Sequence, residues 1–506
     1  MVREEIKKLI LKAIAKTIEI KIEKPEKEEF GDYSTNVALQ LKKDPTEIAK
    51  KLKVGEANAR VFEKIEVAPP GFINFFVSKK YLQKQVEEIL KEKEKYGSLK
   101  IGKNKKINVE FVSANPTGPL HIGNGRGGFC GDVLTNVFQK AGYKSSREYY
   151  INDTGRQIET LRNSLEGKEP CYKNPYIDEL KKKTEKNTKR AVKFIIDKIK
   201  KTAERMGIGY DKWFYESKLY PEETDKVLKL LEKKKLTYKK EGATWFKSTK
   251  FGDDKDRVLI KKDGEKTYIL SDIAYLKNKF ERKFDYLVIF LGAEHHGYVG
   301  RLKAGAEALG YDRKKVKPIV FQLVELIEKG KHVRMSKRTG IYVTIDELLD
   351  EVKGKDVARF FFLTRNYGNH LNFNLDLAKQ QSEKNPVYYV QYAHARICSI
   401  LKKSKIKLTE ASPRSDLLEH PSELKLIKQL IRLPEIVQDT CQDYQVQRLP
   451  QYAVDLAAVF HQFYRDCRVI SENKELTKSR LALVKATKIV LKNTLDLMGI
   501  SSPEKM

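Results

Sequence analysis

One histidine, one asparagine and four glycines stand within eight residues of one another, from His121 to Gly128. The apolar residues at 107, 109 and 111 alternate before them, which is typical of a strand. The intervening Asn115-Pro116-Thr117-Gly118-Pro119 rules out helix and strand pairing, because two of its five residues are prolines. We expect a helix from about residue 123 to 141, ended by Gly142.

A strand, a glycine-rich turn and a helix together form a site for phosphate. The helix N-terminus offers unpaired N–H groups and a partial positive charge. The imidazole of His121 and the amide of Asn124 can both donate hydrogen bonds to phosphate oxygens. Glycines at 123, 125, 127 and 128 let a nucleotide lie close to the backbone. Taken alone, the short His-x-Gly match fits a tight turn with no ligand better than a phosphate site.

A second motif, far along the chain, favours the phosphate site. Val333-Arg334-Met335-Ser336-Lys337-Arg338-Thr339-Gly340 lies in a cationic, loop-like segment. A loop that carries Lys337 and Ser336 suits the role of a clamp over a triphosphate.

The two motifs together resemble the HIGH and KMSKS signatures of class I aminoacyl-tRNA synthetases. The longer match, SANPTGPLHIGNGRGG followed by YYINDTGRQ, resembles the arginyl-tRNA synthetase family. This resemblance covers essentially the whole chain. It implies that ATP and arginine give arginyl-adenylate and diphosphate, and that the arginyl group then passes to the 3′ end of tRNA(Arg).

The resemblance also assigns residues to the reaction. The catalytic residues would be His121, Asn124, Ser336 and Lys337, and Mg²⁺ would bridge the diphosphate. The ATP site would add Pro116, Thr117, Gly118, Gly123, Gly292, Glu294, His295, His296, Val333, Arg334 and Met335. Each signature departs from the family pattern, the first at Asn124 and the second at Arg334 and Arg338. Asn124 stands where the family usually has histidine, and the second signature reads RMSKR, with Lys337 retained.

A guanidinium substrate needs coplanar acceptors, which carboxylates supply best. Glu110, Asp153 and Asp272 stand at expected strand ends or turns. Tyr268 and Asp272 are four residues apart, so one helical turn puts both on one face. By resemblance, the arginine site contains Glu110, Ser113, Asn115, His121, Asp153, Tyr268, Asp272 and His296. Each carboxylate taken alone also fits an ordinary salt bridge with one of the many lysines.

Two further motifs resemble segments through which the family contacts tRNA. Gly31-Asp32-Tyr33-Ser34-Thr35-Asn36 resembles a motif of the N-terminal domain. The stretch NPVYYVQYAHAR and the ending MGISSPEKM resemble the anticodon-binding domain. The tRNA contacts implied are Asp32, Tyr33, Asn36, Tyr388, Gln391, Tyr392, Arg396, Met498 and Met506. We assign Tyr389 and Phe460 to the core, since aromatic residues at helical spacing usually lie there.

The composition points to a polyanionic partner. The 506 residues include 100 Lys and Arg against 69 Asp and Glu, a net charge of +31, which favours nucleic acid over membrane. Five scattered cysteines without a C-x-x-C pair fit a reducing compartment and predict no structural zinc. His295-His296 could bind a metal, but adjacent histidines point apart, so a nucleotide contact is favoured. We expect a cytoplasmic monomer without a membrane segment.

The fold class expected is α/β, with three domains. A small α+β N-terminal domain (1–100) precedes a Rossmann-type, doubly wound parallel-sheet catalytic domain (101–376) with a connective insertion at about 157–260. An all-α anticodon-binding domain (377–506) follows. Lysine-rich 181–201 is either a solvated helix face or a surface for the tRNA acceptor stem. Further helices are expected at 2–19, 422–440, 448–471 and 478–498. Another helix is expected to start at Asp44 as N-cap before Pro45, and a strand is expected at 143–150.

Two other functions fit parts of the sequence. One is an adenylyltransferase or amino-acid ligase that uses no tRNA, which the basic charge and the C-terminal helices disfavour. The other is a non-catalytic tRNA-binding paralogue, which the presence of His121, Lys337 and the carboxylates disfavours. Activation of arginine that requires bound tRNA is a further implication of the resemblance.

Overall fold

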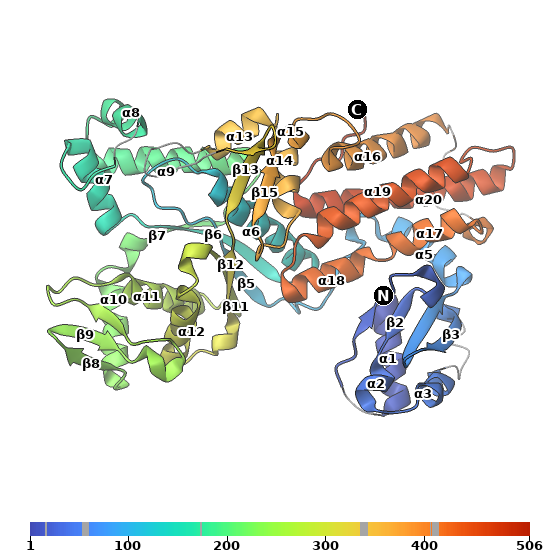
Figure 1. Cartoon of the computed structure of the whole chain (residues 1–506), viewed down its shortest axis with the longest axis horizontal. Helices are drawn as coiled ribbons and strands as arrows, with labels where there is room; N and C mark the ends of the chain where they lie inside the picture. The colour runs from blue at the N-terminus through green and yellow to red at the C-terminus, as the bar shows by residue number, and fades with distance from the viewer. Residues whose placement is uncertain (16–17, 53–59, 173–174, 334–342, 405, 407–413) are drawn as a thin grey trace.

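The computed structural model describes residues 1–506 except 16–17, 53–59, 173–174, 334–342, 405 and 407–413. Figure 1 shows a small unit at the N-terminus, a central α/β body and a bundle of C-terminal helices. Among the helices of the described residues, none is long and apolar enough to cross a membrane.

The N-terminal unit is an antiparallel sheet, in the order β1-β2-β4-β3, packed against short helices. Its elements are α1 (Val2–Ile14), β1 (Ile22–Glu23), η1 (Glu28–Phe30), β2 (Tyr33–Thr35), α2 (Val37–Leu41), α3 (Pro45–Leu52), β3 (Phe62–Ala68) and β4 (Phe72–Val77). Asp44 caps α3 as predicted, since its Oδ1 accepts from the Thr46 N–H at 2.8 Å. The first helix is shorter than the predicted 2–19 because Ala15 takes the left-handed conformation, φ 50°.

The next helix, α5 (Lys79–Glu92), is followed by η2 (Lys93–Lys95). It packs against the C-terminal helices α17 (Pro421–Leu430) and α20 (Lys474–Met498). Residues 1–100 therefore reach the C-terminal helices through α5.

The central body is a parallel sheet in the order β12-β11-β5-β6-β7. Its strands are β5 (Lys106–Glu110), β6 (Lys144–Ile151), β7 (Lys212–Tyr215), β11 (Tyr286–Gly292) and β12 (Val316–Phe321), and α6 (Ile122–Lys140) links β5 to β6. The chain winds from β5 toward β7 on one side and from β11 to β12 on the other. The switch point therefore lies between β5 and β11, where ligands of such sheets bind.

Residues 156–281 carry mostly helices and a small second sheet. They comprise α7 (Arg156–Glu166), α8 (Pro175–Thr184), α9 (Thr188–Arg205), η3 (Glu216–Leu219), α10 (Glu222–Lys233), β8 (Thr237–Lys240), β9 (Ala243–Phe246), η4 (Ser248–Phe251), β10 (Arg257–Ile260) and α11 (Tyr268–Glu281). The small sheet is antiparallel, in the order β10-β9-β8. The expected insertion at 157–260 is not continuous, because β7 within it pairs with β6 of the central sheet.

The second half of the body continues through η5 (Ala293–His295), α12 (Tyr298–Leu309), η6 (Arg313–Lys315), β13 (Val324–Glu328), β14 (Lys331–His332), α13 (Ile345–Glu351), α14 (Lys355–Leu363), β15 (Leu371–Asn374) and α15 (Leu375–Ala378). The hairpin β13–β14 directly precedes the second motif, and β15 pairs parallel to β13.

The C-terminal bundle contains α16 (Pro386–Lys403), η7 (Ser415–Leu417), α17, α18 (Leu433–Asp443), α19 (Arg448–Asp466) and α20. The single helix predicted at 422–440 is two helices, and the prediction was wrong there. Pro434 stands in the first turn of α18, because proline has no N–H for an interior helical bond but is tolerated at a helix start.

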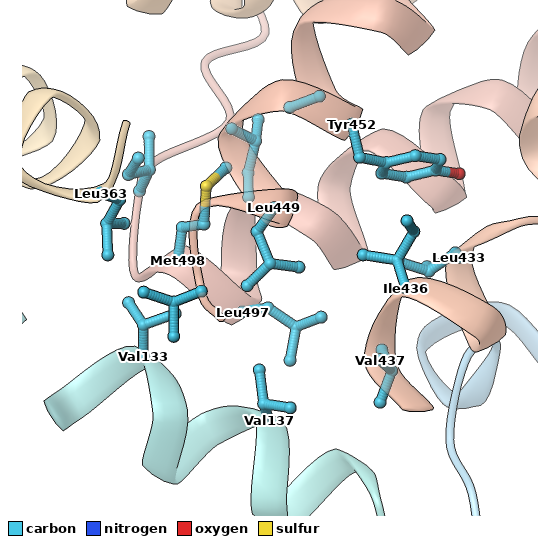
Figure 2. Close-up of a cluster of buried hydrophobic side chains, with 14 of the residues drawn as sticks. Val133, Val137, Leu363, Leu433, Ile436, Val437, Leu449, Tyr452, Leu497 and Met498 are labelled. Carbon is cyan, nitrogen blue, oxygen red and sulfur yellow. The ribbon is translucent and has the colours of Figure 1, made fainter. Parts of the chain in front are cut away.

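The bundle shares a core with α6 of the body. Figure 2 shows Val133 and Val137 of α6 facing Leu497 and Met498 of α20, with Leu449 behind them. Each of these five side chains is buried.

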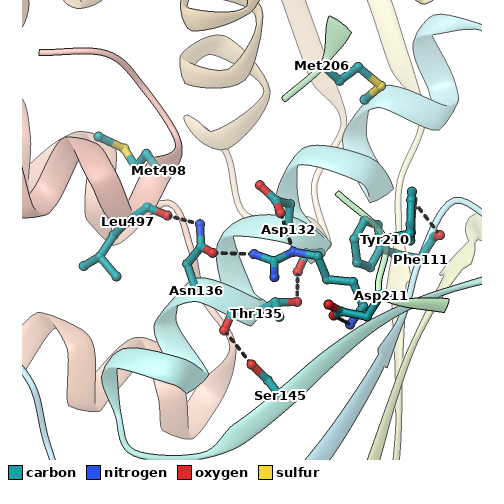
Figure 3. A network of polar contacts seen from close by, with 12 residues as sticks. Phe111, Asp132, Thr135, Asn136, Ser145, Met206, Tyr210, Asp211, Leu497 and Met498 are labelled. Carbon is teal, nitrogen blue, oxygen red and sulfur yellow. Dashed lines mark hydrogen bonds and ion pairs between the residues drawn. The ribbon is translucent and has the colours of Figure 1, made fainter. Parts of the chain in front are cut away.

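Polar contacts join the same two helices (Figure 3). Asn136 of α6 donates to the Leu497 carbonyl at 3.0 Å. Fully buried Arg359 of α14 donates to the carbonyls of Met498 (2.7 Å) and Met206 (2.9 Å) and pairs with Asp132 of α6. The helix that begins at the first motif is thus bonded directly to the last turn of the chain's final helix.

Candidate active site

The turn after β5 is held in a strained conformation. Val112 and Ser113 have φ of 70° and 40°, values that a β-branched residue such as valine rarely adopts. The hydroxyl of Tyr149 accepts from the Ala114 N–H and donates to the Ala114 carbonyl, both at 3.0 Å. The Ser113 hydroxyl donates to Glu110 Oε1 at 3.2 Å. These bonds fix the direction in which residues 115–119 leave the sheet.

The first motif forms the N-terminus of α6, as predicted. Nδ1 of His121 accepts from the Gly123 N–H at 3.2 Å, and Oδ1 of Asn124 accepts from the His121 N–H at 3.0 Å. With Nδ1 accepting, the proton of a neutral His121 ring lies on Nε2, which is then a donor. Asn124 likewise retains its NH₂ group as a donor. The histidine usual at position 124 in the family is therefore replaced by a residue that also caps the helix.

Three of the four motif glycines lie where neighbouring side chains pack closely on α6, and the approach of a nucleotide to them stays a prediction. A Cβ on Gly125 would lie 2.6 Å from Ile345, and one on Gly127 would lie 3.0 Å from Phe321. A Cβ on Gly128 would lie 2.8 Å from Met206. Only at Gly123 does the near neighbour belong to the motif, since a Cβ there would lie 2.9 Å from the His121 ring.

The second motif falls partly outside the described residues, as do Arg334, Met335, Ser336 and Lys337. Its flanks are described. Val333 donates from its N–H to the Leu326 carbonyl at 2.8 Å. At the other flank, the Ile122 N–H donates to the Val343 carbonyl at 3.1 Å, and Thr344 pairs with His121. Val343 and Thr344, the first described residues after RMSKR, are therefore anchored beside the first motif.

The end of β11 lies across the switch point from the end of β5. Glu294, His295 and His296 follow shortly after Gly292, and all three are exposed. The His295 ring lies edge-on to Tyr298, with centroids 5.1 Å apart. In the described part of the chain, no three His, Cys, Asp or Glu side chains are grouped to hold a metal ion.

A group of carboxylates lies beside these strand ends, and we call Glu110, Glu216 and Asp272 the carboxylate pocket. Tyr268 and Asp272 occupy the first turns of α11, four residues apart, as predicted. Burial, together with the charges of Glu216 and Glu110, raises the pKa of Asp272 to about 8, and Arg301 and Lys279 only partly oppose the rise. Ionised Asp272 is therefore short of positive charge in this structure.

Glu110, unlike Asp272, forms an ion pair with a buried cation. It pairs with Lys279, which is completely buried and lies 4.3 Å from the Tyr275 ring centroid. The carboxylate of neighbouring Glu148 accepts hydrogen bonds from both terminal nitrogens of Arg282, at 2.6 and 2.7 Å. Burial raises the pKa of Glu148, but Arg282 and Lys279 outweigh this effect and hold the pKa below its ordinary value. The salt-bridge interpretation thus holds for Glu110, while Asp272 forms no ion pair with another of the described residues.

Glu216 is a pocket residue that sequence reasoning missed. It is buried, and burial raises its pKa, with Asp153 adding to the rise. With its amide oriented to satisfy both neighbours, Asn152 donates to Glu216 Oε2 at 2.6 Å. Asp153, which the sequence resemblance assigned to the arginine site, accepts hydrogen bonds from the N–H and the hydroxyl of Ser217, at 2.9 and 2.7 Å. Asp153 therefore fixes the turn that places Glu216.

Tyr150 and Lys279 were missed as well. Tyr150 lies beside Glu216, where its hydroxyl favours the ionised carboxylate. Burial, with the charges of Glu216 and Asp272, raises the pKa of Tyr150. Tyr150 stood in an expected strand and Lys279 on a helix, where nothing marked them as different from core and surface residues. For Glu216, the only signal was its place directly after an apolar strand.

The N-terminal residues assigned to tRNA contact have other partners. Tyr33 is 5% exposed and donates to Glu435 Oε1 of α18 at 3.0 Å, so its prediction as a tRNA contact was wrong. Asp32 accepts from the Val77 N–H at 2.8 Å and pairs with Lys428 of α17 at 2.7 Å. These residues join the N-terminal unit to the C-terminal bundle. Asn36 is partly exposed, and its role stays a prediction.

The C-terminal residues divide in the same way. Met498 is completely buried, so its prediction as a tRNA contact was wrong. Gln391 donates to Asp356 Oδ2 and to the Ser501 carbonyl, both at 3.0 Å. Tyr388 and Tyr392 lie nearly parallel with centroids 6.2 Å apart, and the Arg396 guanidinium lies 4.7 Å from the Tyr392 ring. Met506 is 52% exposed.

The two aromatic residues assigned to the core differ. Phe460 is fully buried as predicted, whereas Tyr389 is only partly buried and lies against His461, with centroids 5.1 Å apart.

Comparison with known proteins agrees with this geometry along the whole chain. Residues 1–77 match the arginyl tRNA synthetase N terminal domain, and 85–182 and 171–366 match the class I (R) tRNA synthetase catalytic domain. Residues 390–506 match the DALR anticodon binding domain. The arginine–tRNA ligase of Bacillus subtilis is 43% identical, over 100% of this chain and 98% of that protein.

The chain belongs to the arginyl-tRNA synthetase family. The arginine–tRNA ligase of Carboxydothermus hydrogenoformans is also 43% identical, over 96% of this chain and 94% of its own length. The Thermus thermophilus arginyl-tRNA synthetase structure has the same fold, with a TM-score of 0.83 at 23% identity and complete coverage of both chains. The family, the fold class and the enzyme class expected from the sequence are confirmed. The domain boundaries and the individual site residues stay predictions where the structure has not corrected them.

Proposed function

We propose that this arginine–tRNA ligase activates arginine at the switch point between β5 and β11 and transfers it to tRNA. The observation that carries the proposal is the carboxylate pocket. Asp272 and Glu216 both have raised pKa values, because burial places their negative charges together with too few cations. A guanidinium supplies the missing positive charge and presents two parallel N–H groups to a carboxylate.

Within the pocket, we assign Asp272 and Glu216 to the guanidinium. Glu110, which is paired with Lys279, adds a further negative charge to the pocket. Tyr268 is 41% exposed, and its hydroxyl stands at the rim of the pocket. Asn115, Ser113, His121 and His296 stay candidates for the α-amino and carboxylate ends of arginine.

ATP would lie along the N-terminus of α6. The Nε2–H of His121 and the amide of Asn124 donate to phosphate oxygens, and the end of β11 at Gly292 to His296 faces the nucleoside. Pro116, Thr117 and Gly118 form the wall on the β5 side. Ser336 and Lys337 would close over the departing diphosphate, because the residues that follow them are anchored beside His121.

Mg²⁺ would enter with the nucleotide. The described residues contain no cluster that could hold a metal by itself, and Mg²⁺ at such sites is bound largely by substrate phosphates and water. The ion would neutralise phosphate charge as the bond to the diphosphate breaks. The chain's own share is to align arginine and the α-phosphate for in-line attack.

The tRNA would contact both ends of the chain. Tyr388, Tyr392 and Arg396 form a partly exposed aromatic and cationic strip on α16, which suits stacking on unpaired bases. The N-terminal unit is bonded to the same bundle through Tyr33 and Asp32, so one tRNA could span the two.

The carboxylate pocket is tested with arginine and citrulline, which differ in one nitrogen and one charge. We expect millimolar arginine to raise the melting temperature, while citrulline at the same concentration has no effect. Equal responses to the two amino acids would remove the carboxylates as the determinants of specificity. Lysine separates a general need for charge from bidentate recognition.

We further propose that activation needs tRNA. The two motifs lie on opposite halves of the sheet, and α6 is bonded to the end of α20 through Asn136. A tRNA held by the bundle could therefore favour the closed arrangement of the site. Arginine-dependent ATP–pyrophosphate exchange is the test. Exchange that is as fast without tRNA as with it would contradict this proposal, and would leave the ligase activity intact.

A further inference from the structure

Asp272 borders a small cavity between α11 and α12. The cavity has a volume of about 10 Å³ and is lined by Ile269, Asp272, Ile273 and Leu276 of α11 and by Arg301 and Leu302 of α12. On α11 these residues are spaced three or four positions apart or are direct neighbours, so they share one face of the helix. Asp272 and Arg301 are the two charged residues of the lining, and the other four are apolar. Opposite charges therefore border one otherwise apolar gap.

The two helices are packed closely at this place. Ile273 and Leu276 of α11 and Leu302 of α12 are buried. A Cβ on Gly305, one turn beyond Arg301, would lie 2.9 Å from Ile273, so a larger residue there would push α12 away. This close contact keeps the cavity small, and its volume of about 10 Å³ is on the order of what one water molecule needs. The attraction between Asp272 and Arg301 therefore acts over a short distance.

Arg301 is held beside the cavity by its own helix. Its guanidinium carbon lies 4.6 Å from the centroid of the Tyr298 ring, three residues earlier on α12. The Nε atom of Arg301 is buried. Tyr298 is itself in contact with the ring of His295. The guanidinium of Arg301 is thus confined at the cavity, where Asp272 is the carboxylate that shares the lining with it.

Two cations act on Asp272, and they differ in their commitments. Lys279 is already paired with Glu110. Arg301 and Lys279 both lower the pKa of Asp272, against burial and the charges of Glu216 and Glu110. The titratable and charged groups around Asp272 are Glu110 of β5, Tyr150 of β6, Glu216 and Tyr220 at η3, Lys279 of α11, and Tyr298 and Arg301 of α12. Burial raises the pKa of each of the three tyrosines, so they stay uncharged near neutral pH.

We propose that Arg301 is a positioning residue of the arginine site, which acts across the cavity to keep the Asp272 carboxylate charged for the substrate guanidinium. This inference rests on the proposed function, because it places Arg301 behind the carboxylate that binds arginine. Arg301 acts through Asp272 and touches no substrate. No motif of the sequence singled it out, since it stands within a helix after the His295–His296 pair.

The test is the Kd of arginine, measured by calorimetry for the parent and for Arg301→Met from about pH 6 to 9. Methionine keeps an apolar stem and removes the charge. Without this cation the pKa of Asp272 should rise by about one further unit. The variant should therefore bind arginine about tenfold more weakly than the parent at pH 7, and within about twofold of it at pH 9. A merely structural defect would give the same ratio of Kd values at every pH, and that result, or no weakening, would overturn the proposal.

Two matched substitutions separate the charge from its place. Arg301→Lys keeps a positive charge and should bind arginine within about threefold of the parent at pH 7. Lys303→Met removes the same charge from the same helix, but Lys303 does not line the cavity, so the Kd should stay unchanged. A loss as large in Lys303→Met as in Arg301→Met would contradict the assignment, because any charge on α12 would then have the same effect.

The Asp272→Asn background shows whether Arg301 acts through this carboxylate. With asparagine at 272, adding Arg301→Met should cause no further loss that depends on pH, because the group on which Arg301 acts no longer titrates. An equal effect of Arg301→Met in both backgrounds would refute the proposal.

Arginine binding by the parent separates this inference from the proposed function. A parent that does not bind arginine would refute the proposed function, and this inference with it. A parent that binds arginine, with a ratio of Kd values that is flat across the pH range, would refute the role of Arg301 alone.

Discussion

Asp272 stands near the start of α11 with its pKa raised to about 8, because it is buried near Glu216 and Glu110. We therefore expect its ionised form to bind a guanidinium strongly and to destabilise the protein when no guanidinium is bound. Substitution can separate these two effects, since an amide keeps the shape and removes the charge.

Asp272→Asn should lower kcat/KM for arginine by about 2 kcal/mol or more, roughly thirtyfold, because a charged acceptor is lost. The KM for ATP should change little. Without arginine, the variant should be at least as stable as the parent in thermal unfolding, since three crowded carboxylates become two. Unchanged arginine kinetics would remove Asp272 from the pocket.

The raised pKa of Asp272 also predicts how arginine binding depends on pH. Between about pH 4 and 8 the folded protein keeps a proton on Asp272 that the unfolded chain has lost. The contribution of this bound proton to the stability of the fold is therefore fully present below pH 4 and is lost as the pH rises toward 8. Arginine needs the ionised form, so its Kd should fall by up to about tenfold per unit from pH 6 to 8. Calorimetry would detect this, and Asp272→Asn, as the control, should show a shallower dependence, which Glu216 alone then sets.

At the scale of elements, the sequence predicted those that local chemistry determines. The cap at Asp44, the helix starting at the first motif, and the Tyr268–Asp272 turn were all found as expected. The pairing of β7 with the central sheet was not, because strand pairing across about sixty residues leaves no local pattern. Glu216 and Lys279 were missed for the same reason: their partners are distant in sequence, and only the fold brings a carboxylate or a buried lysine to the site.

The glycines of α6 have packing roles that their spacing in the motif did not reveal. Their spacing suggested room for a nucleotide, yet Gly125, Gly127 and Gly128 make room for Ile345, Phe321 and Met206. A sequence shows that a small residue is present and does not show which neighbour needs the space.

The junction between α6 and α20 depends on another glycine. Gly499 has φ 66°, and a Cβ there would lie 2.5 Å from Nη2 of Arg359. The Nε–H of the same guanidinium donates to the Met498 carbonyl. Gly499→Ala should lower the free energy of unfolding by about 2–4 kcal/mol. Alanine costs free energy at a positive φ, and its Cβ would also displace the buried Arg359 from its hydrogen bonds.

Gly167→Ala is the matched control for that substitution. Gly167 has φ 78°, and a Cβ added there would meet no atom within 4 Å, so about 1 kcal/mol of backbone cost is expected. Denaturant unfolding of both variants isolates the contribution of Arg359. Equal losses would mean that the contact with Arg359 contributes nothing.

At the scale of the whole molecule, the net charge of +31 belongs to a protein whose N-terminal unit, body and bundle are bonded together. If this charge meets tRNA phosphates, affinity must depend on salt through counterion release. For about six phosphate contacts, log K should fall against log salt with a slope of roughly −4 to −5. Filter binding between about 50 and 300 mM KCl measures this slope. A slope near zero would mean that the charge reflects surface composition alone.

The most direct test of the whole account is aminoacylation of total tRNA with each of the twenty amino acids in turn. The carboxylate pocket, the α6 N-terminus and the two tRNA-facing ends together predict that arginine alone is esterified to tRNA. Uncharged amino acids should be rejected by roughly 10⁴-fold or more, because they leave buried carboxylates unpaired. Charging of another amino acid at a comparable rate, or no charging with arginine, would contradict the account.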